Sequence, residues 1–480
     1  MLKIIPALNQ YSDNALFWGF AFCVIVLSGT AIGFNSPYPI LVPALLLFVL
    51  FSFNNPRHLF YLFFFLLPFS MELQLPSGLG TDLPSEPIMV FLFAICILFF
   101  IRSTKNISRW ILIHPVSLII IIHLGWILFT AFFSANFIVS IKFFLAKTWY
   151  VFPFYFLPLI LFKSEKEIRK IFIFLSIGLF IAVTYVFIRH SLNGFAFHQI
   201  NEAVKPIFRN HVNYSVMLVA FIPYMWYLVK SSTLKNKIFL YSLFLFLLVA
   251  IYFTYTRAAQ LSIVLSLAIY WVIRWRLLKY ALALSLVGII GLSTYLSYNN
   301  KYLEFAPNYE RAIAHDKFDN LLEATYKMED ISTVERFYRW VAGFYMVKEK
   351  PFTGYGPSTF YSQYSAHTVT SYKTYVSDNP EKSGIHNNYL MVAAEQGLPG
   401  LAIMLLLAFL PLIYAEKAYH LLKKSSEKLL VMAAAICFAL IDIIILINDL
   451  LEADKVGPFY FLSAAIIVFF YNFTQKKKSQ

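Results

Sequence analysis

Charged residues and cysteines are both scarce in this chain of 480 residues. Only 13% of the residues are charged, whereas 60% are hydrophobic and phenylalanine alone occurs 51 times. A soluble protein of this length cannot bury so much apolar surface, so the composition indicates a protein that crosses a membrane many times. All three cysteines, Cys23, Cys96 and Cys437, lie inside apolar runs. We therefore expect no framework of disulfide bonds.

Several chemical motifs are also missing. The short connections between apolar runs contain no Asp-x-Asp and no paired carboxylates, and Asp82 and Glu86 stand apart. The histidines show no metal-ligand spacing, and no phosphate-binding P-loop is present. The two halves of the chain show no clear duplication of the kind found in many transporters. These absences argue against a metal centre and against a transporter built from repeats.

Apolar runs fill most of the remaining sequence. A spanning helix needs about 20 apolar residues, and we read the first run as a retained span rather than a removed signal peptide. Some of the runs are short, notably 59–71, so we predict an all-α polytopic membrane protein with 12 to 14 transmembrane helices. The fourteen candidate spans are 15–33, 39–53, 59–71, 87–101, 111–133, 149–162, 168–188, 212–229, 238–255, 258–273, 280–297, 399–414, 429–447 and 457–471.

The basic residues divide unevenly between the two sides of the membrane. With a cytoplasmic N-terminus, 22 of the 39 lie on the cytoplasmic side and ten lie in one long outer loop, which crosses the membrane largely regardless of its charge. We therefore predict cytoplasmic termini and a periplasmic long loop, and we attribute the net charge of +14 to topology rather than to nucleic-acid binding. The seven exceptions in short outer connections are Lys142, Lys147, Arg189, Lys205, Arg209, Arg257 and Lys455.

The long loop divides the chain into three predicted parts. Residues 1–297 form an N-terminal bundle of about eleven spans, residues 298–386 form the outer loop, and residues 387–480 hold the last spans and a basic tail. Inside the loop, Ser332 and Glu335 have the spacing of a capping box, which predicts a helix that ends near Pro351. We expect an apolar stripe of Trp340, Phe344 and Val347 to pack this helix onto the membrane core.

Four outer positions are candidates for chemistry. Arg257 lies in a tight turn between two spans, where an arginine either snorkels to the interface or binds an anion in a water-filled cavity. Arg209 stands at another outer mouth and is equally consistent with an ordinary loop residue. Lys147 is best explained there as an interfacial anchor. His386 opens the helix after the loop, and histidine is the side-chain type suited to acid–base chemistry near neutral pH, although a histidine at a helix start is often only a cap.

The ordered set of these motifs resembles the O-antigen ligase family, which includes related polymerases of lipid-linked glycans. The resemblance covers about 150 residues around the outer loop, and the first 200 residues match only as hydrophobic spans. The matching elements, in order, are Thr256-Arg257-Ala258, then Glu335-Arg336 with Trp340, then Pro351-x-x-Gly354-x-Gly356 with Phe360, and last His386-Asn387-x-Tyr389-Leu390-x4-Glu395-x-Gly397-x-x-Gly400.

The resemblance implies an activity and a site. Such enzymes move a glycan from undecaprenyl diphosphate to an acceptor hydroxyl, such as that of lipid A-core, at the outer face of the bacterial inner membrane, without a metal or another cofactor. It implies that His386 helps to deprotonate the acceptor, and that Arg257, Arg336 and Arg209 bind the diphosphate. Bidentate arginine contacts suit the charge that develops on that leaving group. The accessory candidates are Arg339, Lys147, His211, Asn387, Tyr389 and Glu395.

Other functions remain open from the sequence. A repeat-unit polysaccharide polymerase or a protein O-oligosaccharyltransferase uses the same donor and differs only in its acceptor. A multi-span transporter is the alternative from another class. It would need ionisable residues within spans, and Asp442 is the only clear example; the alternative for Asp442 is a pair with a wrong-side arginine.

Overall fold

The computed structural model describes residues 55–74, 80–102, 107–299, 331–369 and 383–478, together with positions 22, 26, 27, 30, 52, 53, 301 and 377. Two compact units divide the chain, Met1–Phe63 and Phe64–Gln480, and the candidate site lies in the second. The predicted spans 15–33 and 39–53 lie outside the described residues, apart from isolated positions. The side chain of Ser332, and with it the predicted capping box, also lies outside them.

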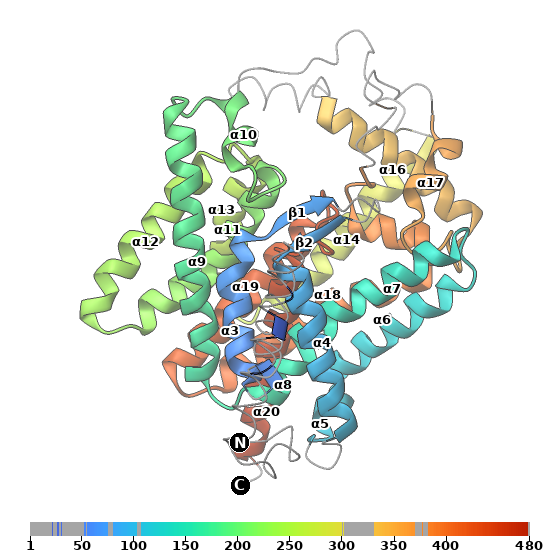
Figure 1. Ribbon diagram of the computed structural model, residues 1–480. Coiled ribbons are helices and arrows are strands. Elements are labelled where there is room, and N and C mark those ends of the chain that lie inside the picture. Colours follow the sequence, from blue (N-terminus) through green and yellow to red (C-terminus); the bar gives the residue numbers. More distant parts are fainter. Residues whose placement is uncertain are drawn as a thin grey trace. The chain divides into compact units, whose positions relative to one another are not determined.

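Helices dominate the described residues (Figure 1). Two long helices of the late part of the chain contribute to the candidate site. α16 lies in the segment 298–386, which is predicted to be periplasmic and is still called the outer loop, and α18 follows that segment. The helices before the outer loop are α3 (Pro56–Leu66), α4 (Ser85–Arg102), α5 (Trp110–Ile113), α6 (Pro115–Ala131), α7 (Phe137–Val151), α8 (Leu157–Leu161), α9 (Glu165–Leu192), α10 (Ile200–Val204), α11 (His211–Ser231), α12 (Leu234–Tyr252), α13 (Arg257–Arg274) and α14 (Leu278–Ser297). Those in and after it are α16 (Ile331–Glu349), α17 (Phe360–Gln363), α18 (Asn388–Leu421), α19 (Ser425–Ile444) and α20 (Gly457–Lys478). The single-turn 3₁₀ segments are η2 (Leu67–Phe69), η4 (Phe197–Gln199) and η7 (Tyr364–His367).

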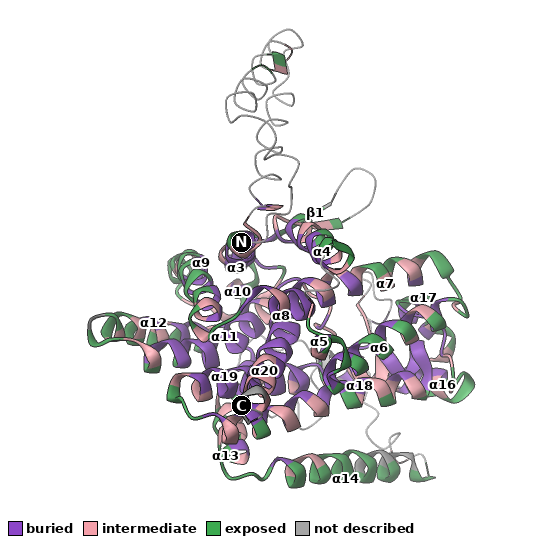
Figure 2. Ribbon diagram, turned by 90° about the horizontal axis from the view of Figure 1, so that it is seen from below, coloured by how far each residue is buried: buried purple, intermediate pink, exposed green. Residues whose placement is uncertain are grey.

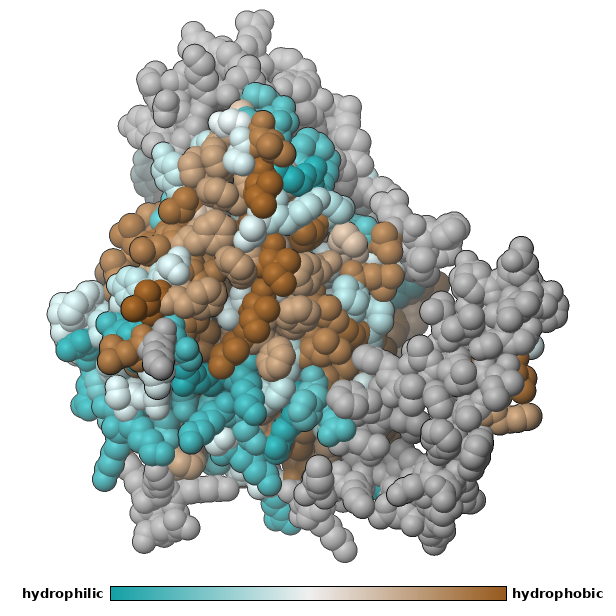
Figure 3. Space-filling model, turned by 60° about the vertical axis from the view of Figure 1, so that its left-hand side comes forward, coloured by the Kyte–Doolittle hydropathy of each residue, from teal (hydrophilic) through white to brown (hydrophobic). Residues whose placement is uncertain are grey.

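Seven helices within the described residues are long and apolar enough to cross a membrane. Shorter apolar helices occupy 56–69, 115–131, 236–252 and 278–291. Exposed aliphatic and aromatic side chains line α9 and α12, and Figure 3 shows a broad hydrophobic band on this face, bordered below by hydrophilic residues. The predicted all-α polytopic membrane fold is confirmed, while the total of 12 to 14 spans stays a prediction.

The best-buried helices form the centre of the second unit. α11 packs against α19, α19 packs against α20, and α18 contacts α6, α19 and α20. Figure 2 shows α11, α19 and α20 mostly buried and α18 buried over part of its length, whereas α12 and α14 are largely exposed. α18, which begins directly after the segment that carries His386, is therefore held against this buried centre.

One helical segment differs from the prediction. Residues 137–161 form a single helical rod, in which α7 passes through the π-helix η3 (Phe152–Phe156) into α8. The predicted span began at residue 149 because Lys142 and Lys147 interrupt the hydropathy. Lys147 therefore lies within a helix instead of at its outer mouth. Lysine is a good helix former, so it does not interrupt the helix. The charge of Lys147 is tolerated in this buried position because it is paired with the carboxylate of Glu452.

A two-stranded hairpin joins α3 to α4. Strand β1 (Met71–Gln74) pairs antiparallel with β2 (Gly80–Leu83). The hairpin region is bonded to the connection between α19 and α20, residues 445–456, which we call the α19–α20 connection. The Ser85 hydroxyl donates to Asp454 at 2.9 Å, and Lys455 Nζ donates to the Ser70 carbonyl at 2.6 Å. This connection thus contacts segments far from it in the sequence.

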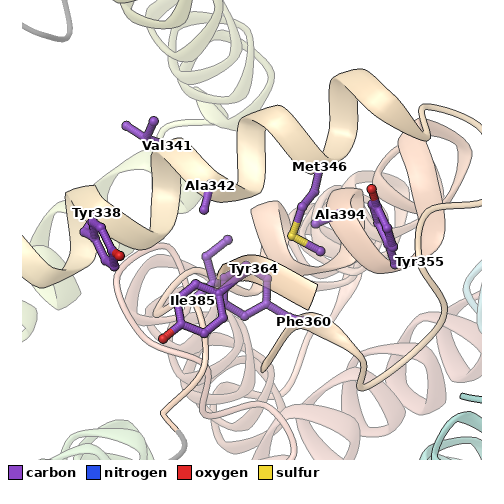
Figure 4. Close-up of a cluster of buried hydrophobic side chains, with 9 residues drawn as sticks. All are labelled: Tyr338, Val341, Ala342, Met346, Tyr355, Phe360, Tyr364, Ile385 and Ala394. Carbon is purple, nitrogen blue, oxygen red and sulfur yellow. The ribbon is translucent and has the colours of Figure 1, made fainter. Parts of the chain in front are cut away.

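The predicted helix of the outer loop is confirmed as α16, but its buried face differs. Phe344 is 56% exposed, whereas Trp340 and Val347 are partly buried and pack against the core, as expected. Four residues of α16, Tyr338, Val341, Ala342 and Met346, belong to a buried hydrophobic cluster. In Figure 4, Ala342 and Met346 point toward the chain around Ile385 and Ala394. α16 therefore packs on the segment that precedes α18 and on α18 itself, so it is tied directly to the site.

Candidate active site

His386 lies at the turn that leads into α18. Its backbone has a φ of 57°, a left-handed conformation that is uncommon for a residue with a side chain. The next residue, Asn387, caps the helix, because its side-chain oxygen accepts the backbone N–H of Leu390 at 3.0 Å. Asn387 is thus the N-cap of α18, and this cap fixes the position of His386 directly before the helix. Backbone conformations of this kind concentrate at functional sites.

The imidazole of His386 has a carboxylate partner that sequence reasoning missed. Its Nδ1 lies 3.3 Å from Oδ1 of Asp449, and the two side chains are 29% and 21% exposed. Burial raises the pKa of Asp449, but the hydrogen bond and charge of His386 and the charge of Arg339 outweigh it, so this pKa lies below its usual value. Asp449 is therefore ionised at neutral pH and can orient the imidazole and stabilise its protonated form.

Two side chains of α16 hold the backbone just before His386. The Arg339 guanidinium donates to the Gly384 carbonyl at 3.1 Å, and its other terminal nitrogen lies 3.6 Å from Glu335. The Trp340 indole N–H donates to the Ile385 carbonyl at 3.1 Å. The structure therefore brings Arg339 and His386 together and gives Arg339 and Trp340 a positioning role.

The arginines expected to bind the diphosphate lie on separate elements. Arg257 is the first residue of α13 and is half-buried, directly after a turn in which Tyr255 has a φ of 53°. α13 packs against α19, the helix that leads to Asp449. Arg336 is half-buried on α16, three residues before Arg339. The tight turn predicted at Arg257 is confirmed, while the diphosphate-binding role of both arginines stays a prediction.

Arg209 and His211 are engaged in local contacts. Arg209 is 67% exposed, and its Nε lies 3.4 Å from Glu72 on strand β1. His211 begins α11, and its Nδ1 lies 2.8 Å from the side-chain oxygen of Asn201. The Ile207 carbonyl, two residues before Arg209, accepts a hydrogen bond from Lys455 in the α19–α20 connection. Arg209 therefore lies beside this connection, with a carboxylate as its neighbour.

Lys147 and Tyr389 are bonded inside the protein. Lys147 Nζ lies 2.6 Å from Glu452 Oε1, and the Lys147 side chain is only 4% exposed. The Tyr389 hydroxyl donates to Asp442 at 3.1 Å, so the partner of Asp442 seen here is a tyrosine rather than the expected arginine. Burial of the charged and phenolic groups favours such internal pairing. Neither side chain is placed as a free ligand for a substrate.

Glu395, Gly354 and Gly397 connect loop 351–360 to the kink of α18. The Glu395 carboxyl accepts the backbone N–H groups of Ser358 and Phe360 at 2.8 and 2.9 Å. α18 is kinked at Gly397, which has a φ of 73°, and a Cβ there would lie 2.2 Å from the Phe352 carbonyl. A Cβ on Gly354 would in turn lie 2.3 Å from the Glu395 backbone. These motif residues therefore lock loop 351–360 onto the kink of α18.

The site can carry out proton transfer. An accessible histidine is held by a carboxylate and by a fixed backbone, which is the arrangement of a general base and its orienting group. Asp449 follows an apolar run and lies 63 residues after His386, so no local pattern joins the two. The sequence signal that was missed is a group of three carboxylates, Asp449, Glu452 and Asp454, in one short connection between two spans, so the expectation that such connections hold no paired carboxylates was wrong.

Comparison with known families agrees with the motif pattern. A family model described as O-antigen ligase matches residues 242–405. The match extends from α12 to the first half of α18 and includes Arg257, Arg336, Arg339, His386 and Glu395. It confirms the predicted resemblance and indicates a glycosyl-transferring membrane enzyme of the O-antigen ligase and polymerase type. No curated protein matches the chain.

Proposed function

We propose that this protein is a membrane glycosyltransferase that moves a glycan from undecaprenyl diphosphate to an acceptor hydroxyl at the periplasmic face. As an O-antigen ligase it would join the polysaccharide to lipid A-core. The observation that carries the proposal is the His386–Asp449 pair, held before α18 by Arg339 and Trp340, with His386 inside the matched region. A repeat-unit polymerase or a protein O-oligosaccharyltransferase would use the same pair with another acceptor.

His386 acts as the base in the proposed reaction. Its Nδ1 faces Asp449, which leaves Nε2 for the proton of the acceptor hydroxyl. The acceptor oxygen forms a bond to the anomeric carbon as the bond from that carbon to the phosphate oxygen breaks. The electron pair leaves with undecaprenyl diphosphate, and the proton passes to His386. Base assistance of this kind contributes roughly 10²–10⁴ in rate.

Arginines stabilise the leaving diphosphate in this proposal. Arg257 and Arg336 are both half-buried, so their charges act in a medium that screens them less than bulk water does. Arg209 would exchange its exposed contact with Glu72 for a phosphate oxygen. An exposed ion pair contributes only about 0–1 kcal/mol, so this exchange costs little.

The proposed location is the bacterial inner membrane, with both termini cytoplasmic and the outer loop in the periplasm. The basic residues support this orientation, because 22 of the 39 then face the cytoplasm. The donor enters sideways from the bilayer, and the acceptor enters from the outer leaflet or the periplasm. We propose no nucleic-acid partner.

Substitution of His386 tests the proposal. The full chain, purified in lipid nanodiscs, is given an undecaprenyl-diphosphate-linked glycan and lipid A-core. His386→Ala should insert and fold but lose transfer, and Asp449→Asn should reduce it, because the imidazole loses its orienting charge. The control is His198→Ala, which removes an exposed histidine of another outer connection. Full transfer by His386→Ala would remove this residue from the mechanism.

The products distinguish the candidate functions. In cells, a His386→Ala strain with unmodified lipid A-core and accumulated carrier-linked polymer indicates a ligase. Single-repeat products on lipid A-core indicate a polymerase, and loss of protein glycosylation alone indicates a protein transferase. Movement of the intact donor across vesicles, without any new glycosidic bond, would support the transporter instead.

A further inference from the structure

Lys147 is a buried cation within the helical rod of residues 137–161. Its ammonium group pairs with Glu452 of the α19–α20 connection at 2.6 Å, and it also lies 5.9 Å from the ring centres of Phe143 and Phe461. Tyr150, one turn further along the same rod, donates to the Glu452 backbone carbonyl at 2.8 Å. The helical rod of residues 137–161 thus holds Glu452 by both its side chain and its backbone.

Glu452 reaches the start of α18 through Asn388. The Asn388 side-chain amide donates to Glu452 Oε2 at 3.2 Å, and the Asn388 backbone N–H donates to the Ile445 carbonyl at 2.9 Å. Asn388 is two residues after His386, and Glu452 is three residues after Asp449. Three contacts therefore join the same two short segments: Asn388 to Ile445, Asn388 to Glu452, and His386 to Asp449.

We propose that Lys147 is a positioning residue for His386, acting through Glu452 and Asn388. This inference rests on the proposed function of His386 as the base. Lys147 fixes Glu452, Glu452 fixes the first residue of α18, and the α19–α20 connection that carries Glu452 also presents Asp449. The placement of the His386 imidazole against the Asp449 carboxylate therefore depends on the Lys147 ammonium group, which contacts neither of them.

The surroundings of Lys147 argue against direct contact with the donor. The side chain is nearly fully buried and already paired, so a diphosphate would have to displace Glu452 from a closed site. Beside the pair is a cavity of about 10 Å³, lined by His123, Asn388 and Gln396 among others. That volume is close to the space of one water molecule. The cavity cannot admit a phosphate, so Lys147 acts on the site only through its protein partners.

A pair of matched variants tests this inference. Lys147→Met keeps the length and apolar stem of the side chain and removes its charge. Lys142→Met makes the same change at an exposed position of the same helix, α7. In the nanodisc assay, Lys147→Met should lower kcat by about 100-fold, as expected for a misplaced catalytic group, with the KM for the donor unchanged. Lys142→Met should keep wild-type kcat.

A double variant tests the route. If Lys147 acts through Glu452, then Lys147→Met combined with Glu452→Gln should be no slower than the slower single variant. Wild-type kcat in Lys147→Met would overturn the inference. A raised donor KM at unchanged kcat would also overturn it, because that result means direct donor binding.

A readout without turnover separates this inference from the proposed function. Diethyl pyrocarbonate modifies accessible imidazoles, and mass spectrometry gives the rate for each histidine. His386 should react faster in Lys147→Met than in the wild type, because its contact with Asp449 is loosened, while His198 serves as the internal reference. Faster modification without any glycan transfer by the wild type would leave the positioning inference standing and reject the proposed function. An unchanged modification rate in a folded variant would reject the positioning inference alone.

Discussion

Replacement of Glu395 tests whether this residue is structural or chemical. The residue is 2% exposed, and its two carboxyl oxygens accept the N–H groups of Ser358 and Phe360. In Glu395→Gln one oxygen becomes an amide NH₂, so one of these buried donors loses its acceptor. An unsatisfied buried donor costs about 1–3 kcal/mol. Glu395→Ala removes both acceptors, so its loss of stability should be about 2–6 kcal/mol.

Thermal unfolding of the purified chain, followed by intrinsic tryptophan fluorescence, measures these losses. The melting temperature should fall in the order wild type, Glu395→Gln, Glu395→Ala. Glycan transfer is then measured at a temperature below the melting temperature of the least stable variant and divided by the amount of folded protein. This activity should stay near that of the wild type, because the Glu395 carboxyl group holds loop 351–360 and does not reach the reacting atoms. The control is Glu349→Gln, which changes an exposed carboxylate paired with His367 and should leave the melting temperature close to wild type.

One result would refute the structural role. If Glu395→Gln melts like the wild type and yet has lost transfer, the carboxyl group takes part in the chemistry or in substrate binding. If Glu395→Gln has a lower melting temperature but wild-type activity per folded molecule, the role of Glu395 is to accept the two backbone hydrogen bonds.

Two other substitutions should change stability in ways that the geometry specifies. Gly397→Ala should destabilise the protein by about 2–4 kcal/mol, because it places a Cβ 2.2 Å from the Phe352 carbonyl at a φ of 73°; Gly125→Ala on α6, with open space around its Cβ, is the control in the same melting assay. Burial, together with the charges of Asp454 and Glu86, raises the pKa of Asp82 to about 7. The folded state therefore favours the neutral carboxyl, and a penalty for ionising it grows between pH 4 and pH 7, so Asp82→Asn should raise the melting temperature at pH 8 and have little effect at pH 4. Equal effects of Asp82→Asn at both pH values would contradict this explanation.

Local patterns predicted most of the helices. Apolar runs placed α9, α11, α12, α13 and α14 within a few residues of their observed ends, because a spanning helix satisfies its own backbone hydrogen bonds and needs only a continuous apolar surface. The outer-loop helix was also predicted, since its stop at Pro351 is a local signal. The buried face of α16 was not predicted, because tertiary packing decides that Ile385 and Ala394 lie against this helix.

The site divides in the same way. The sequence alone determined that the chain crosses a membrane, that it resembles O-antigen ligases, and that His386, Arg257 and Arg336 were the residues to examine. Three features were decided only by the tertiary structure. Asp449 faces His386, the helical residue Lys147 pairs with Glu452 of the α19–α20 connection, and Glu395 and Gly397 hold loop 351–360. A pair of residues 63 or 305 positions apart leaves no periodic trace in the sequence, because its energy comes from burial and charge that exist only after the helices have packed.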